Sequence, residues 1–326
     1  MRKAVLLYNP ASGGGRGRQR DLEAALAVLR NGGVEAELVL TRSRADAAEQ
    51  ACRAVAAGHD TVFACGGDGT IHDVIQGLAS SPVALAILPL GTANALAHDL
   101  ALPLRPVAAA RAALAAVPLR IPLGKVAYRD FQGQPATRYF TVAAGLGVDA
   151  HLFYKLNPSA KNRLGMAAYY AKAWRLWMSH RMVRFQATWT DLGTGAPRSA
   201  SLTELLAVRI RNFGGILREL APGASLHCSD VRLLMCHTSN RSAYLNHVTR
   251  SMLGLPGAVR GVEILASASI FCDYAEDPQG TSARRVYVQA DGELLGTLPA
   301  KITVIPDALT LLVPADFASA DRHPGV

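Results

Sequence analysis

Three short stretches of the sequence combine glycines with residues that can bind a phosphate or support its transfer. They are NPASGGG at residues 9–15, GGDGT at residues 66–70 and LPLGTANALA at residues 88–97. Glycines let the backbone approach a phosphate closely, and a helix that begins after such a loop offers free N–H groups and the positive end of its dipole. These stretches therefore predict a site for a phosphate-bearing ligand.

Each stretch also has a structural interpretation. The first has no Gly-Lys-Ser/Thr of a Walker A loop, and Arg18 stands at the third glycine position of G-x-G-x-x-G, so a surface loop is the alternative. In the second, Asp-Gly is common in turns, while Asp68 can place a carboxylate near a phosphate and Thr70 suits the N-cap or first turn of a helix. In the third, Thr92 can cap a helix, and Asn94 can offer a donor and an acceptor to a ligand or to the neighbouring loop.

Two further glycine motifs have weaker chemical interpretations. GLGVDA at residues 145–150 fits G-x-G-x-x-A after a strand, but the acidic residue that binds a ribose about 20 positions later is missing through Thr190. We therefore reject a dinucleotide site there. QADGE at residues 289–293 ends a strand, and because Asp-Gly is a strong turn signal, this motif by itself predicts a hairpin.

The elements that must position these loops alternate in type over the first 120 residues. Short apolar runs predict strands at 3–8, 34–40, 61–65 and 84–88, and Ala-rich segments predict helices at 17–30, 44–57, 70–79, 92–100 and 105–117. This alternation predicts a doubly wound parallel α/β domain. Ligand sites in such sheets lie in the loops after the strands' carboxyl ends, here residues 9–17, 41–43, 66–70 and 89–92.

The character of the sequence changes after Pro118. Strand-like runs at 121–128, 138–143, 183–190, 205–210, 231–237, 259–266, 285–290 and 301–305 are separated by turn residues, with helices expected only near 161–179 and 241–252. We predict an α/β domain at 1–120, a mainly antiparallel β-sandwich domain at 121–306, and a segment at 307–326 that returns to the first domain and then frays.

Length and composition exclude several classes of protein. The chain has 326 residues, 50% of them hydrophobic and 18% charged, which predicts about two folded domains rather than disorder. Five cysteines without CxxC spacing indicate neither a zinc site nor a disulfide framework, so a cytoplasmic location is expected. The apolar start is too short for a signal peptide, and the longest uncharged run, 83–97, is interrupted by Pro89 and Gly91, so no spanning helix is expected.

The net charge of +9 is concentrated in one segment. Between Asp149 and Asp191 there are seven Lys and Arg residues, no acidic residue and all three tryptophans, and the rest of the chain carries +2. This segment predicts a basic and aromatic surface that visits an anionic membrane, or else a solvated helix face. The residues proposed for the membrane or lipid are Lys161, Arg163, Lys172, Trp174, Arg175 and Trp177. Nucleic acid is not expected as a partner, because no binding motif accompanies the charge.

Taken together and in this order, NPASG, GGDGT, LGTANALA and the distant DGE resemble the diacylglycerol kinase catalytic-domain superfamily, which includes soluble bacterial lipid kinases, sphingosine kinases and ceramide kinases. The resemblance extends from Asn9 to about Ile305 and includes KNRLG at residues 161–165. NAD kinases and phosphofructokinases have loops similar to GGDGT, but GTANALA and DGE distinguish this chain from both.

The resemblance implies an ATP- and Mg²⁺-dependent lipid kinase that holds its nucleotide between a phosphofructokinase- or NAD-kinase-like domain and a β-sandwich. It implies that Asp68 belongs to the catalytic network near the phosphates and Mg²⁺, directly or through water, and that Glu293 is the general base for the lipid hydroxyl. The nucleotide contacts that it implies are Asn9, Ser12, Thr41, Gly66, Gly67, Asp68, Gly69, Thr70, Thr92 and Asn94. A homodimer is compatible with it.

The chain departs from the family pattern at three places. Ala95 and Pro122 stand where many bacterial diacylglycerol kinases have Asp, which resembles the sphingoid and ceramide kinases more and leaves the acceptor open between diacylglycerol-like and sphingoid- or ceramide-like lipids. Arg232 stands where a carboxylate would bind a structural second-domain metal, so no such site is expected. The alternatives are a kinase of a soluble hydroxyl substrate such as NAD, and a non-catalytic lipid- or nucleotide-binding homologue.

Overall fold

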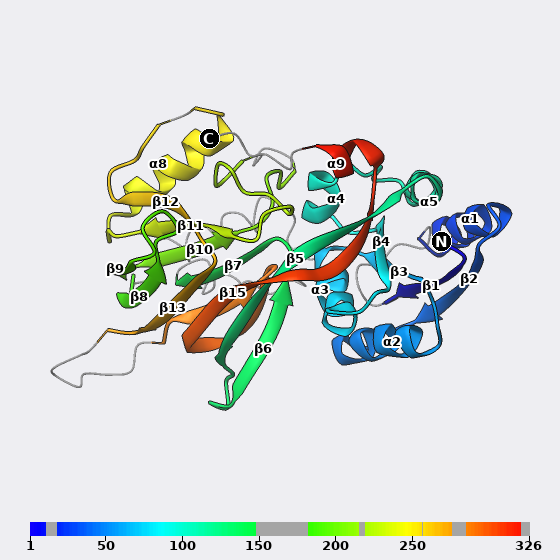
Figure 1. Cartoon of the computed structure of the whole chain (residues 1–326), viewed down its shortest axis with the longest axis horizontal. Coiled ribbons are helices and arrows are strands. Elements are labelled where there is room, and N and C mark those ends of the chain that lie inside the picture. Colours follow the sequence, from blue (N-terminus) through cyan, green and yellow to red (C-terminus); the bar gives the residue numbers. More distant parts are fainter. Residues whose placement is uncertain (11–17, 148–181, 215–218, 256, 276–284, 321–326) are drawn as a thin grey trace, which may run out of the picture.

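The computed structural model describes residues 1–10, 18–147, 182–214, 219–255, 257–275 and 285–320. Figure 1 shows an N-terminal part with helices on both faces of a sheet, beside a C-terminal part built mainly of strands. Two long strands, β5 (Val117–Arg129) and β15 (Glu293–Val313), run between the two parts. The described strands form one continuous hydrogen-bonded sheet system, because β15 joins both parts.

The N-terminal domain contains a parallel sheet with the order β2-β1-β3-β4. Its strands are β1 (Lys3–Tyr8), β2 (Glu35–Leu40), β3 (Thr61–Gly66) and β4 (Ala84–Pro89), and its helices are α1 (Arg18–Asn31), α2 (Arg44–Ala56), α3 (Asp68–Leu78), α4 (Ala95–Asp99) and α5 (Pro106–Leu114). The helices α1 and α5 cover one face of the sheet, and α2 and α3 cover the other. Strands buried on both faces are near-continuous apolar runs, and for this reason the sequence predicts them well.

The helices predicted at 92–100 and 105–117 are both shorter in the structure, where the second ends at Leu114 and Val117 already belongs to β5. The segment 92–100 is helical only from Ala95, because Asn94 adopts a left-handed conformation with φ of 49° and is itself the N-cap residue. Thr92 lies in the loop before it and does not cap the helix. Helix α3 begins at Asp68, two residues before its predicted start at Thr70, with Gly67 as its N-cap and Thr70 in its first turn.

The C-terminal domain is antiparallel. Its further described strands are β6 (Pro135–Phe140), β7 (Ala143–Gly147), β8 (Phe185–Thr190), β9 (Pro197–Leu202), β10 (Glu204–Val208), β11 (Val231–Cys236), β12 (Val262–Ser267), β13 (Ser269–Tyr274) and β14 (Tyr287–Ala290). Among the described residues it has the helix α8 (Arg241–Met252), and the short α9 (Ala315–Ser319) follows β15 and lies beside α4 (Figure 1). The strands β12-β11-β10-β7-β14 form one layer, and β9-β8-β13-β15-β5-β6 form the other. A core of buried side chains from both layers fills the space between them, as expected for a sandwich.

The sequence did not predict β9 and β13, and it predicted only a fraction of β15. Strand β9 is mostly exposed and polar, with the sequence Pro-Arg-Ser-Ala-Ser-Leu, so it carries little hydrophobic signal. Strand β15 passes through Pro299 and Pro306, which normally end strands, and its pairing with β5 is irregular between Thr297 and Lys301 and again between Ile305 and Leu309. Its last part pairs in parallel with β4 through Thr310 and Leu311.

The hydrophobic core beneath α3 and α4 is shared by the two domains. Ile121, Val142 and Val208 from the β-rich part belong to the same buried cluster as Leu96 of α4 and Ile75 of α3. This shared core fixes the carboxyl ends of β3 and β4 against the β-rich domain, where the glycine loops lie.

Candidate active site

The two glycine loops after β3 and β4 contact each other backbone to backbone. The strands are in register, with Gly66 opposite Pro89, so their loops leave the sheet side by side. A Cβ atom on Gly91 would lie 2.5 Å from the Cα of Gly67, and one on Gly67 would lie 3.1 Å from the Cα of Gly91. Both positions therefore require glycine because of this close approach.

Asp68 lies where the two loops meet. It is the first residue of α3, and the backbone N–H groups of Ala95 and Leu96 at the start of α4 lie near enough to its carboxylate to favour the charged form. Burial raises the pKa of Asp68, those N–H donors lower it, and the negative charge of Asp291 raises it. The oxygen Oδ1 is buried and has no hydrogen-bond partner among the described residues. A buried acceptor in this state fits a carboxylate that receives a cation or a hydrated cation.

The side chain of Asn94 organises its own loop. Its Oδ1 accepts from the N–H of Gly91 at 3.0 Å, and its Nδ2 donates to the carbonyl of Gly91 at 3.0 Å. The sequence left open a ligand or the neighbouring loop as the partner of Asn94, and in the structure both amide atoms instead bond to Gly91 of its own loop. Thr92 is exposed beside it.

The first two strands add Asn9 and Thr41 at the same edge of the sheet. Thr41 is buried, its N–H donates to the carbonyl of Tyr8 at 2.8 Å, and its Oγ1 has no partner among the described residues. Thr70 is also buried, and a Cβ on Gly66 would collide with its side chain. Ser12 lies outside the described residues.

The hairpin between β14 and β15 brings two more carboxylates, those of Asp291 and Glu293, to this edge of the sheet. Asp291 and Gly292 have φ of 47° and 81°, as a tight hairpin turn requires, so the predicted hairpin at QADGE is confirmed. The Asp291 carboxylate accepts from the N–H groups of Thr141 at 3.0 Å, Val142 at 2.9 Å and Ala143 at 3.0 Å. Its side chain is only 2% exposed. Asp291 thus ties the hairpin to the β6–β7 corner.

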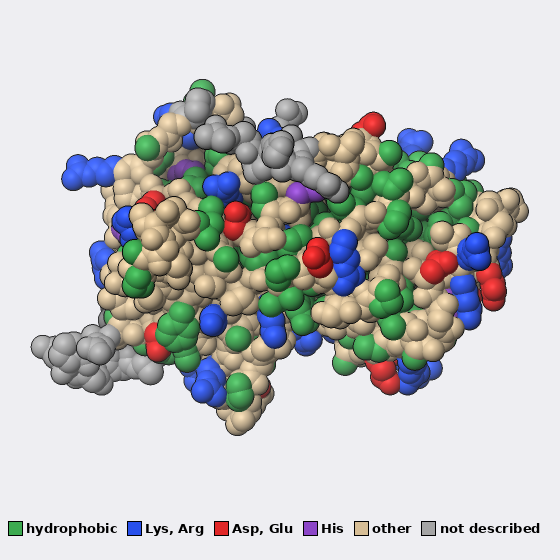
Figure 2. Space-filling model, in the orientation of Figure 1, with side chains coloured by type: hydrophobic (Ala, Val, Ile, Leu, Met, Phe, Trp, Pro, Cys, Tyr) green, Lys and Arg blue, Asp and Glu red, His purple; other side chains and the backbone are tan. Residues whose placement is uncertain are grey.

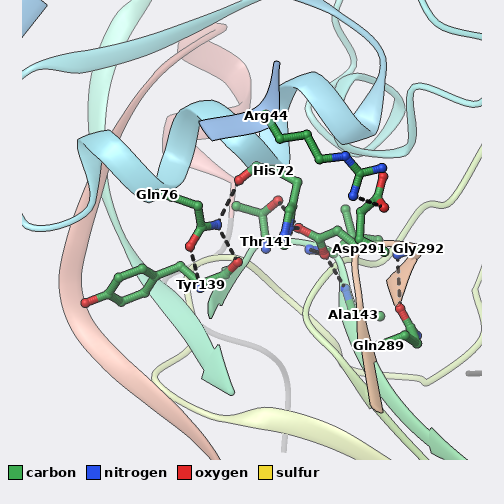
Figure 3. Close-up of polar contacts among 11 residues, drawn as sticks. Arg44, His72, Gln76, Tyr139, Thr141, Ala143, Gln289, Asp291 and Gly292 are labelled. Carbon is green, nitrogen blue, oxygen red and sulfur yellow. Dashed lines mark hydrogen bonds and ion pairs between the residues drawn. The ribbon is translucent and has the colours of Figure 1, made fainter. Parts of the chain in front are cut away.

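Helix α3 is anchored to the same corner. His72 Nδ1 lies 3.4 Å from Asp291 Oδ2, and both side chains are buried. The amide of Gln76 donates to the carbonyls of His72 at 2.8 Å and Tyr139 at 2.9 Å, and accepts from the N–H of Tyr139 at 3.0 Å. Figure 3 shows these contacts side by side along α3. The first turns of α3 are therefore held rigidly against the second domain.

Glu293, the first residue of β15, lies against the GGDGT loop. A Cβ on Gly69 would lie 3.2 Å from Glu293 Oε1, and Arg44 Nη1 lies 2.5 Å from Glu293 Oε2. Asp73 is close to this pair, and burial raises its pKa to about 6, opposed by the charge of Arg44. Asp68 and Glu293, from different domains, therefore both lie beside the first turn of α3.

The sequence interpretation did not assign roles to Arg44, His72, Asp73 and Gln76, and it assigned Asp291 to a turn. The signal for Asp291 was present in DGE, but a turn residue gives no indication of what its side chain binds. The spacing of His72 and Gln76 places them on one face of a helix, but it does not show which part of the second domain that face contacts. The residues expected to approach the membrane, Lys161, Arg163, Lys172, Trp174, Arg175 and Trp177, lie outside the described residues.

The loop at 227–232 of the second domain, where Arg232 replaces a metal-binding carboxylate, surrounds the side-chain cation of Arg209. Arg209 is fully buried, and its guanidinium donates to the carbonyls of Cys228 at 2.9 Å, Asp230 at 2.7 Å, Pro122 at 2.9 Å and Leu226 at 3.3 Å. Burial lowers its pKa to about 10, so it is charged at neutral pH. Within the described ranges, no group of three or more His, Cys, Asp and Glu residues is arranged to hold a metal ion by itself.

The described residues form no cluster of Lys and Arg on the face of the molecule drawn in Figure 2. In Figure 2, Lys and Arg side chains are scattered among hydrophobic and polar ones over both domains. None of the described helices is long and apolar enough to span a membrane.

Comparisons with known proteins agree with this geometry. The family model "Diacylglycerol kinase catalytic domain" matches residues 3–126, and "YegS C-terminal NAD kinase beta sandwich-like domain" matches residues 142–313. A "Diacylglycerol kinase" of Bacillus subtilis (strain 168) is 26% identical over 324 residues, covering 98% of each chain. A solved diacylglycerol kinase structure from Bacillus anthracis str. Sterne is 16% identical with a TM-score of 0.69, covering 97% of this chain and 98% of that one. Yeast NADH kinase complexed with NADH has a TM-score of 0.50 at 12% identity, covering 98% and 85%.

Proposed function

This chain belongs to the diacylglycerol kinase catalytic-domain superfamily, and from this premise we propose that it transfers the γ-phosphoryl group of ATP to the hydroxyl of a lipid alcohol. The enzyme is a lipid kinase by family. The donor nucleotide, the metal ion, the acceptor lipid and the residues that serve them form the finer proposal.

One observation carries the assignment of roles. Two glycine loops in backbone contact, from β3 and β4, lie beside carboxylates from both domains, Asp68 and Glu293. Phosphoryl transfer requires positioned phosphates and a carboxylate near the attacking hydroxyl, with little covalent chemistry from the protein. In this proposal the loops bind the phosphates, while Asp68 belongs to the first turn of α3 and Glu293 lies against Gly69 of the same turn.

The nucleotide contacts follow from the same edge of the sheet. We assign phosphate binding to the loop Gly66–Thr70, to the backbone of Thr92 and Asn94, and to the free hydroxyl of Thr41, whose buried Oγ1 has no partner among the described residues. Asn9 at the end of β1, and Ser12 in the loop that follows, complete the proposed set. Asn94 acts through the loop that its side chain holds, because both of its amide atoms are engaged with Gly91.

Asp68 fits the role of holding Mg²⁺, directly or through water, because its Oδ1 is buried and has no partner in the described part of the chain. When bound, Mg²⁺ supplies neutralisation of the negative charge on the phosphate oxygens. The protein contributes the rest. It fixes Asp68 between the N-termini of α3 and α4, and it holds Asp291 through three backbone N–H groups so that the hairpin carrying Glu293 cannot shift.

In the transfer step the acceptor oxygen forms a bond to the γ-phosphorus, while the bond from that phosphorus to the bridging oxygen of ADP breaks. The acceptor proton passes to Glu293. Because the leaving ADP carries the bonding electrons away, no redox partner is needed. Many bacterial diacylglycerol kinases have carboxylates at two positions where this chain has Ala95 and Pro122. This difference favours a sphingoid- or ceramide-like acceptor without excluding a diacylglycerol-like one.

The location of the protein is part of the proposal. A lipid kinase must reach its substrate in a bilayer, and the basic and aromatic segment between Asp149 and Asp191 suits an anionic surface. We propose a cytoplasmic protein that binds the membrane peripherally, with nucleic acid excluded as a partner and a homodimer allowed. Co-sedimentation with vesicles of neutral and of anionic lipid tests this, and equal binding to both would contradict it.

The decisive experiment is the transfer of ³²P from Mg·ATP to a total lipid extract, with the product identified by mass spectrometry. We expect Glu293→Gln to lower kcat by about 10²–10⁴-fold, as for the loss of a general base, and Asp68→Asn to abolish most of the activity. Matched controls are Glu35→Gln and Asp21→Asn, which change exposed carboxylates elsewhere on the first domain.

Three outcomes contradict the proposal. Phosphorylation of NAD or another soluble hydroxyl compound without any lipid product would identify a different kinase. Binding of ATP in a calorimeter without transfer to any lipid would identify a non-catalytic homologue. Full activity of both site variants would show that the roles are assigned to the wrong residues.

A further inference from the structure

Arg44 holds one oxygen of the carboxylate that serves as the proposed base. Its Nη1 lies 2.5 Å from Glu293 Oε2, and Figure 3 shows its side chain reaching from the start of α2 to the hairpin. The Arg44 side chain is 63% exposed and that of Glu293 is 22% exposed, so the pair lies at the surface of the site rather than beneath it. Because Arg44 belongs to the first domain and Glu293 to the second, the direction of the carboxylate depends on this contact.

The other oxygen of Glu293 faces a position without a side chain. A Cβ on Gly69 would lie 3.2 Å from Oε1, which is tighter than nearly all contacts of real Cβ atoms. Gly69 has no positive φ, so its backbone does not require glycine. A Cβ at residue 69 would meet Glu293 Oε1 and, outside its own helix, no other heavy atom of the described residues within 4 Å, so without a side chain there a hydroxyl can approach Oε1 and donate a hydrogen bond to it.

Arg44 also lies near a second carboxylate. Asp73 follows Gly69 by one helical turn, and the charges of Arg44, His72, Glu293 and Arg138 all act on it. A cation shared between Glu293 and Asp73 reduces their mutual repulsion, which would otherwise turn the Glu293 side chain away from the loop.

We propose that Gly69 and Glu293 Oε1 form the subsite for the acceptor hydroxyl, and that Arg44 is the positioning residue that directs Oε1 to it. This inference rests on the proposed function. Since the guanidinium occupies Oε2, the acceptor O–H donates to Oε1. The proton passes to Oε1 as the acceptor oxygen bonds to the γ-phosphorus and ADP leaves.

The test compares Arg44→Ala, Arg44→Lys and Gly69→Ala with wild type and with Arg53→Ala. Arg53 is a matched control because it lies on the same helix, is also 63% exposed and forms an ion pair of 2.5 Å with Glu49. Initial rates are measured with Mg·ATP and either dioctanoylglycerol or sphingosine in mixed micelles. ATP affinity is measured by calorimetry and folding by thermal melting.

We expect Arg44→Ala to lower kcat by about 10–100-fold, because a small misplacement of a catalytic group has this effect, while the KM for ATP stays within about twofold. Arg44→Lys restores part of the loss, since one cationic contact is kept. Gly69→Ala lowers kcat/KM for the lipid by at least about 10-fold, because its Cβ takes the space of the hydroxyl. Arg53→Ala is unchanged.

Each contrary result has a separate meaning. If the wild-type protein is active and Arg44→Ala has the same kcat, the positioning role of Arg44 is overturned. If Gly69→Ala keeps the full kcat/KM for the lipid, the proposed subsite is overturned. An equal loss in Arg53→Ala shows that α2 as a whole matters and overturns the specific role of Arg44. A wild-type protein that phosphorylates no lipid overturns the proposed function, and this inference with it.

Discussion

Replacing Asp291 tests whether its carboxylate holds the two domains together at the site. Its Oδ1 accepts from the N–H groups of Val142 and Ala143, and its Oδ2 accepts from that of Thr141 and lies beside His72. In Asp291→Ala, three buried N–H groups lose a charged acceptor. Since a buried donor left unpaired costs about 1–3 kcal/mol and water can replace part of the contact, we expect a loss of about 4 kcal/mol.

Asp291→Asn should be milder for a reason visible in the geometry. The asparagine Oδ1 can still accept from Val142 and Ala143, while the new NH₂ group meets the N–H and Oγ1 of Thr141 and Nδ1 of His72. Asparagine also adopts the φ of 47° at this position at a lower cost than alanine does. We expect a loss of about 2 kcal/mol, half of that in the alanine variant.

Urea titration at pH 7.5 measures the free energy of unfolding, and calorimetry measures the melting temperature. For a chain of this length the melting temperature should fall by about 6 °C in Asp291→Ala and by about 3 °C in Asp291→Asn. The control is Asp130→Ala, because the Asp130 carboxylate accepts from the N–H groups of Gln132 and Gln134 within its own hairpin. If Asp291→Ala loses no more stability than Asp130→Ala, the bridging role is refuted.

Three other substitutions have defined outcomes. Burial raises the pKa of Asp99 from 3.8 to about 6 in the folded protein, so its ionised carboxylate destabilises the fold fully above pH 6, and this destabilisation disappears toward pH 4. Asp99→Asn keeps the Oδ1 that accepts from Arg211 and Asn212, so we expect urea titration to show a free energy of unfolding about 1–2 kcal/mol higher than wild type at pH 8 and equal to it at pH 4. A stabilisation that persists at pH 4 would contradict this. Arg209→Met removes the guanidinium from four carbonyls and should lose about 3 kcal/mol or more in the same titration; a near-neutral result would show that those carbonyls find other partners. Gly91→Ala would place its Cβ 2.5 Å from the Cα of Gly67, so we expect a loss of about 1–3 kcal/mol and weaker ATP binding by calorimetry, and unchanged binding would separate this contact from the nucleotide.

The parallel sheet and its loops could be predicted because their signals are local. Strands covered on both faces are continuous apolar runs, and a loop that brings two backbones together needs glycine, as Gly67 and Gly91 do. The start of α4 was missed because Asn94 adopts a left-handed conformation, which residue type permits but does not dictate. Strand β15 was shortened because Pro299 and Pro306 normally end strands, and only its partners on both sides keep it extended.

The roles of side chains between the domains followed a different pattern. DGE was visible as a turn and, through the resemblance, as the location of a base. That Asp291 accepts from Thr141, Val142 and Ala143 depends on β14 pairing with β7, a pairing between segments about 145 residues apart. No spacing within either segment reveals it.

The sequence by itself determined the class of chemistry, because glycine loops with a carboxylate after parallel strands allow few functions and occur here in a family order. It also determined the α/β domain and the strand-rich character of the remainder. The tertiary structure alone decided which groups meet: Glu293 against Gly69, Arg44 on the far oxygen of Glu293, and Asp291 between the hairpin, α3 and the β6–β7 corner. The physical reason is that these contacts join residues far apart in the chain, and their positions are set by strand register and by a core shared between the domains rather than by local propensity.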